Sequence, residues 1–476
     1  MHSEPSDHGN AAVPARLTRR ASPRRPLRLS LLAAGLLWCG ASQAVDLGPY
    51  FTLTGVMKTS IQRGSNVCTD CQRFPNEGKD RVFADELVQG AEFGSETTFF
   101  TLVNPYLEGK YDLPGGFQIS GLLSKRWRNR DTDSPGDLTK DIQGIDWFAR
   151  NIALSHEQYG SVRIGIMPTR AWSVADYPIA TEIGNSAAWA DTGAGYGVNN
   201  KAIRYTSRVL DVSNGDLVLE ATYDFGDTSF DINKPRFWEL WVNYRRGGLI
   251  IDAMYQDTRN GNPQAFGKGP FLGLTPNSAD DPKLGGSGQS IFMLMARYEV
   301  DSSLQFSGGI RRNRWSGAYA VCVDFVDGQC RFNNMFNTDW GGTDANGVPN
   351  PGYSVTSYDA MAGARYRMGS WEAYTSLTYL GKGSTDNPSE RGQSNTALIG
   401  GLGLRYNFDR SLQVHVEVGG IRYGLSPQMS GCGSVTRPEG SCTLSPTSIG
   451  SNAFNGVDSR VTQTGNWIAT GVDFVF

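Results

Sequence analysis

Apolar and polar residues alternate along most of the chain, in segments of about ten residues. One such segment places Leu412, Val414, Val416 and Val418 between Gln413, His415 and Glu417. A period of two is typical of a β-strand with one apolar and one polar face. No segment after Ala44 has the eighteen consecutive apolar residues that a membrane-spanning helix requires. The pattern therefore predicts strands, of a length suited to crossing a bilayer at a tilt.

Short and long connections take turns between these segments. Six short links rich in Gly, Asp and Ser and one slightly longer link favour tight hairpins: Pro114–Gly116, Gln158–Gly160, Arg246–Gly248, Asp301–Ser303, Gly369–Ser370, Asp409–Ser411 and Val209–Gly215. Eight long polar connections lie between them: 64–95, 129–144, 169–200, 227–235, 258–289, 317–356, 381–393 and 425–461.

Seven short and eight long connections join sixteen strands. Short turns at one end and long loops at the other are typical of outer-membrane barrels. We therefore predict an all-β fold, a 16-stranded antiparallel transmembrane β-barrel with short periplasmic turns and long extracellular loops. A soluble β-sandwich or a secreted repeat protein is the alternative, but such folds rarely combine this period with so regular an order of connections.

The two chain ends carry signals of export. Six arginines precede an apolar run at 29–41, and Ser42-Gln43-Ala44 supplies small residues for cleavage. This pattern predicts a signal peptide over 1–44 and a mature barrel over 45–476. At the other end, alternate residues from Ile468 to Phe476 form one apolar face that ends in an aromatic residue. Such an end is similar to the signal read by the barrel assembly machinery, although a buried last strand in a globular protein is the plainer interpretation.

Six cysteines of the predicted mature chain fall in three close pairs, all within the long connections: Cys68 and Cys71, Cys322 and Cys330, Cys432 and Cys442. Exported chains fold under oxidising conditions, so local disulfides are the default expectation. The C-x-x-C spacing at Cys68 also fits a metal or redox site, but no nearby histidine supports one. The pairing is left open.

Four segments together resemble the Gram-negative general porins. They are the opening strand Gly48–Gln62, the hairpin Asn151–Met167, the segment Asn200–Tyr205 and the final Gly471–Phe476. The resemblance implies a homotrimeric, sixteen-stranded diffusion channel without cofactors. Two departures stand out: Gly165 leads into Ile166-Met167-Pro168 instead of Arg-Gln, and the acidic Pro-Glu-Phe-Gly-Gly-type loop motif is missing.

The connection 169–200 occupies the position at which porins fold a loop into the channel. We expect it to form the constriction, with Arg170, Asp176, Glu182 and Asp191 lining the pore; an exposed loop with solvated charges is the alternative. A basic wall is expected to face it. The polar faces of the strands nominate Lys58, Arg126, Arg163 and Arg204 for this wall, and Arg365, Arg367 and Arg405 in later strands.

Composition narrows the function further. A net charge of −3 does not suggest a nucleic-acid partner. Only His156 and His415 remain in the predicted mature chain, in distant strands and without a nucleophile motif, so we expect neither an enzyme nor a metal site. The expected function is passive diffusion of ions and small hydrophilic solutes across the outer membrane, in contact with its lipid. A porin preferring anions such as phosphate, or a structural or adhesive barrel without a channel, is the alternative.

Overall fold

A computed structural model describes residues 44–65, 95–125, 127–130, 147–175, 198–226, 234, 236–259, 275–276, 287–317, 319–320, 322–326, 329–332, 354–381, 384–385, 395–425 and 464–476. The barrel strands are β2 (Phe51–Ser65), β3 (Ser95–Asp112), β4 (Phe117–Ser124) continued by β5 (Trp127–Arg130), β6 (Ala149–His156), β7 (Gly160–Pro168), β8 (Val198–Thr206), β10 (Gly215–Asp224), β11 (Arg236–Arg246), β12 (Leu249–Arg259), β14 (Ser287–Glu299), β15 (Leu304–Gly317), β19 (Ser354–Met368), β20 (Trp371–Leu380), β22 (Asn395–Asn407), β23 (Leu412–Leu425) and β24 (Thr464–Val475).

Several shorter elements accompany the barrel. They are β1 (Val45–Asp46), the 3-10 turn η2 (Pro114–Gly116), β9 (Leu210–Val212), β13 (Thr275–Pro276), β16 (Tyr319–Ala320), β17 (Cys322–Val326), β18 (Gln329–Phe332), β21 (Ser384–Thr385) and one short helix, α3 (Arg170–Ala175). β13 pairs with β16, and β17 pairs with β18, as two small hairpin-like sheets outside the main one. Among the described residues, no helix has the length and apolar character to cross a membrane.

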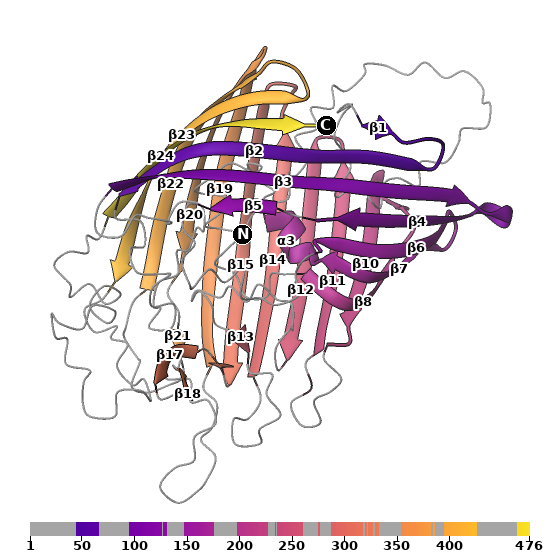
Figure 1. The fold of residues 1–476 in the computed structure, drawn as a ribbon, viewed down its shortest axis with the longest axis horizontal. Coiled ribbons are helices and arrows are strands. Elements are labelled where there is room, and N and C mark those ends of the chain that lie inside the picture. The colour runs from indigo at the N-terminus through magenta and orange to yellow at the C-terminus, as the bar shows by residue number, and fades with distance from the viewer. Residues whose placement is uncertain are drawn as a thin grey trace, which may run out of the picture.

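Each barrel strand pairs antiparallel with the next one along the chain, and the last strand pairs with the first (Figure 1). The closing register runs from Val56 opposite Val475 to Ser65 opposite Asn466. Beyond it, the N–H of Gly55 donates to the carbonyl of Phe476 at 2.7 Å, and the N–H of Phe476 donates back at 3.0 Å. The predicted closed barrel of sixteen antiparallel strands is confirmed.

All seven predicted short links are tight turns between neighbouring strands. In the turn after β14, the carboxylate of Asp301 accepts hydrogen bonds from the N–H groups of Ser303 and Leu304, at 2.7 and 2.9 Å. These two donors hold the pKa of Asp301 below its ordinary value, because they favour the charged form. The contribution to stability is therefore present at neutral pH and is lost as the pH falls through the lowered pKa.

The alternation seen in the sequence separates the two faces of the wall. On β22, Leu402 and Leu404 are exposed on the outside, while Arg405 is buried on the inside. On β23, Val416 and Val418 face outward, and His415 and Glu417 face inward. The outer face is therefore apolar and the inner face mostly polar, as a barrel in lipid requires.

A lipid-facing arginine near the middle of a strand should destabilise the barrel in proportion to its depth. We expect Leu402→Arg to lower the free energy of unfolding by about 2–4 kcal/mol and Phe408→Arg, in a periplasmic turn, by about 1 kcal/mol or less. The two side chains are similarly exposed, at 61% and 59%, so depth is the main difference. Urea unfolding from lipid vesicles measures both, and equal losses would contradict the outward placement of Leu402 in the hydrocarbon.

Candidate pore lining and third loop

The chain turns into the barrel directly after β7. Gly165 has a φ of 127°, and a Cβ at this position would lie 2.4 Å from the carbonyl oxygen of Arg150. Only glycine fits there, and the register between β7 and β8 shifts between Gly165 and Met167. After this bulge Ile166, Met167 and Thr169 are all buried. The bulge thus leads the chain away from the outer face and toward α3.

A carboxylate of the barrel wall receives the first turn of α3. Glu239 on β11 accepts hydrogen bonds from the backbone N–H groups of Arg170 and Ala171, at 2.7 and 3.0 Å. These amides have no partner within the helix, so an anion from the wall satisfies them. The start of the third loop is thereby attached to the inner face of the barrel.

The side chain of Arg170 makes a second attachment. Its Nε and one terminal nitrogen donate to the two carboxylate oxygens of Glu220 on β10, at 2.6 and 2.7 Å. Such a bidentate pair combines charge with fixed geometry and is stronger than a neutral hydrogen bond. The guanidinium also lies over the ring of Trp241, 4.7 Å from its centre, within the range of a cation–π contact.

Arg204 completes this network. Its Nε lies 3.1 Å from Glu220 and donates to the hydroxyl of Thr222, while a terminal nitrogen donates to the carbonyl of Pro168 at 2.8 Å. The same terminal nitrogen is 3.7 Å from Glu239. Two arginines and two glutamates therefore form one buried charge network, which holds the end of β7 and the start of α3 against β10 and β11.

An apolar patch covers the wall beside α3. Ala171 and Val174 belong to a buried cluster with four inward-facing methionines: Met254, Met293, Met295 and Met361. Met254 lies opposite Met293 in register, and both Met295 and Met361 pair with Gly309, which leaves room above it. The polar pattern did not predict this patch. Its signal in the sequence is the unbroken apolar run from Ile291 to Met295, which indicates a strand covered on both faces.

A second charged cluster lies on the periplasmic half of later strands. Arg365, Arg367 and Arg405 converge on Glu372, with nitrogen–oxygen distances of 3.7, 3.1 and 3.0 Å. The guanidinium of Arg405 also lies 5.5 Å from the ring centre of Tyr374. Three positive groups thus share one carboxylate.

The basic residues nominated in the early strands fall into two separate places. Arg163 faces inward beside the Arg170–Arg204 network and donates to the side chain of Asn151. Lys58 lies on β2, in register with Asp473 of β24, because the barrel closes at that seam. It therefore joins the side of the barrel that carries Arg405 and His415, whose ring nitrogen is 3.6 Å from Asp473.

Several nominated residues lie outside the described part of the chain: Arg126, Asp176, Glu182, Asp191, Cys68, Cys71, Cys432 and Cys442. Cys322 and Cys330 lie on the paired strands β17 and β18, where Cys322 is in register with Phe332 and Cys330 with Phe325. The two cysteines are thus neighbours in one hairpin without being direct register partners, and their disulfide stays a prediction.

The Arg170–Glu220 pair should contribute strongly to the stability of the channel. We expect Arg170→Met to lower the free energy of unfolding by about 3–5 kcal/mol, because it leaves Glu220 charged and buried without its main partner. Adding Glu220→Gln should recover part of this loss. Arg259→Met is the matched control, since Arg259 pairs at 3.0 Å with Asp257 but is half exposed, and it should cost about 1 kcal/mol or less. Equal urea midpoints for the Arg170 variant and the natural chain would contradict the expected contribution.

Comparisons with known proteins agree with this geometry. The family model for the Gram-negative porins matches residues 29–424. A solved anion-selective porin from Comamonas acidovorans has 14% identity and a TM-score of 0.52, with 90% of this chain and 99% of that chain covered. The outer-membrane protein OmpT of Vibrio cholerae has 11% identity and a TM-score of 0.49, with 91% and 100% covered. No curated protein sequence matches significantly. The chain belongs to the Gram-negative porin family and forms a channel in the outer membrane.

Proposed function

We propose that this porin is a general diffusion channel with weak charge selectivity. The observation that carries the proposal is the pairing of charges on the inner wall: Arg170 and Arg204 with Glu220 and Glu239, and Arg311 with Asp359 at 2.8 Å. Paired charges cancel much of each other's field on a passing ion, whereas a ring of one sign selects. Polar solutes then pass according to size more than charge.

The third loop narrows this channel in our proposal. Its first turn is held inside the barrel by Glu220 and Glu239, so the residues that follow start from within the lumen. Asp176, Glu182 and Asp191 then supply carboxylates at the constriction. The wall around Arg365 and Arg405 supplies positive charge on later strands, and the two signs together set up a transverse field.

A preference for anions is the second candidate function. Three guanidinium groups share the single carboxylate of Glu372, which leaves local positive charge on the periplasmic half of the wall. The neighbour from Comamonas acidovorans is described as anion-selective, but at 14% identity the likeness extends to the fold alone.

Assembly follows the family in our proposal. The chain works as a homotrimer, and the outer-membrane assembly machinery inserts it by reading the final strand that ends in Phe476. A heat-sensitive shift in mobility on a denaturing gel tests the trimer, since a folded trimer runs as a larger species before heating. A single species at monomer size, with and without heating, would contradict it.

Planar-bilayer recording of the purified protein tests the channel itself. We expect ohmic conductance steps and, in a salt gradient, a reversal potential close to zero for a weakly selective pore. A reversal potential close to that of an ideally anion-selective membrane would favour the second candidate. The absence of any conductance, with a correctly folded protein, would overturn both and favour a structural or adhesive barrel.

Neutralising the third loop tests the constriction. The triple variant Asp176→Asn, Glu182→Gln and Asp191→Asn should shift the reversal potential toward anions, because it removes three negative charges from the narrowest part. The matched control is Asp301→Asn with Asp409→Asn, which removes carboxylates from periplasmic turns. An unchanged reversal potential in the triple variant would show that these side chains do not line the pore.

A further inference from the structure

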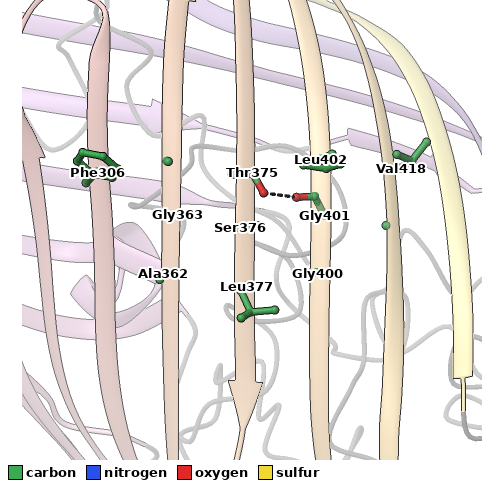
Figure 2. Close-up of a pocket in the computed structure, with 12 residues that line it drawn as sticks. Phe306, Ala362, Gly363, Thr375, Ser376, Leu377, Gly400, Gly401, Leu402 and Val418 are labelled. Atoms are coloured by element: carbon green, nitrogen blue, oxygen red, sulfur yellow. Dashed lines mark hydrogen bonds between the residues drawn. The ribbon is translucent and has the colours of Figure 1, made fainter.

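The outer face of the barrel carries an apolar groove across β15, β19, β20, β22 and β23. It has a volume of about 700 Å³ and continues into a neighbouring hollow of about 490 Å³, with which it shares Ala364, Thr375, Leu402 and Val418. Figure 2 shows Phe306, Leu402 and Val418 along one level of the strands and Leu377 beyond them. These large side chains are exposed on the lipid-facing side.

Small residues create the groove. Ala362, Ala364 and Gly400 lie between the larger side chains, so the surface of the wall is hollowed there. The hydroxyl of Thr375 donates to the carbonyl of Gly401 at 3.0 Å (Figure 2), and this bond satisfies the hydroxyl within the wall. The groove therefore offers almost purely apolar contacts.

Three arginines lie on the same outer face, toward the extracellular ends of the strands. Arg312 is in register with Phe292 and Tyr358, which are both exposed, and Arg314 with Ser290 and Thr356. Arg422 is in register with Leu398, which is 42% exposed. Register partners share a face, so all three guanidinium groups start from the outer surface.

These arginines flank the groove on its extracellular side. Arg312 follows Gly308 by four residues on β15, and Arg422 follows Val418 by four on β23, which corresponds to about 13 Å along each strand. The outward positions of the described residues in β14, β15, β19, β20, β22, β23 and β24 hold no carboxylate. Within that same part of the chain, none of the three arginines forms an ion pair.

From this arrangement we infer a binding site for a phosphate-bearing, multiply acylated lipid of the extracellular leaflet. Its acyl chain lies in the groove, and its phosphate groups accept hydrogen bonds from Arg312, Arg314 and Arg422. Arginine suits this role because its planar fork of donors matches phosphate geometry. The charge complementarity selects a lipid over a second copy of the chain, whose outer face offers no carboxylate on these strands.

The test measures binding of rough lipopolysaccharide to the full mature protein in neutral detergent, by native mass spectrometry. The variant Arg312→Gln, Arg314→Gln and Arg422→Gln should weaken binding at least tenfold. The control variant Lys201→Gln, Arg236→Gln and Arg259→Gln removes three outward cations from the extracellular ends of β8, β11 and β12, and it should stay within twofold of the natural chain. Equal affinity of the first variant and the natural chain would overturn the site.

A second pair of measurements separates the two halves of the ligand. Gly400→Val fills the groove, and it fits because an added Cβ meets its nearest atom, Cδ1 of Leu377, at an ordinary 3.7 Å. We expect it to weaken binding several-fold while conductance and the unfolding midpoint stay unchanged. Lipopolysaccharide stripped of phosphate by a phosphatase should bind at least tenfold more weakly than the intact form.

Three results would reject the lipid site. Undiminished binding of the dephosphorylated form would remove the role of the arginines. Displacement of the lipid by an equal concentration of inorganic phosphate would show that the groove contributes nothing. A change of oligomeric state in Gly400→Val would identify the groove as an interface between copies of this chain. None of these outcomes depends on whether the pore is weakly selective or prefers anions.

Discussion

Closure of the hydrogen-bonded wall is the constraint on which the rest of this molecule depends. Hydrocarbon offers no partner to a backbone N–H or carbonyl group, so every strand that crosses the membrane needs a neighbour on both sides. The mutual bonds between Gly55 and Phe476 extend the seam between β2 and β24 to the last residue of the chain. Once the seam is closed, alternate residues have only two environments, lipid and lumen.

The lumen is not simply the polar counterpart of the outer face. The bulge at Gly165 turns the chain inward, and two glutamates on neighbouring strands receive it, one through the backbone of α3 and one through Arg170. Methionines then meet the apolar side of the helix. A short segment is thereby held inside a wide barrel by a charge network and an apolar contact, and the channel can be narrowed without filling its interior with strands.

The outer face is similarly divided. Its middle is apolar, and small residues hollow it, while arginines stand toward the extracellular ends of β15 and β23. A charge costs less near the membrane interface than at mid-bilayer, so this is where outward arginines are tolerated. The same position brings them to the level of the lipid headgroups, which gives this face a chemical role beyond contact with bulk lipid.

The sequence by itself determined the strands, their order and the face of each residue. Alternation alone predicts that Leu402 faces lipid and Arg405 faces the lumen, because side-chain direction in a strand is a local property. Only the tertiary structure decided which inward residues meet. Lys58 and Arg163 look equivalent along the chain, yet closure places Lys58 beside Asp473, while Arg163 stays near Arg170. Arg170 finds Glu220 fifty residues later, because strand pairing and the bulge at Gly165 bring them together. Such partners depend on registers summed around the whole ring, which no local pattern contains.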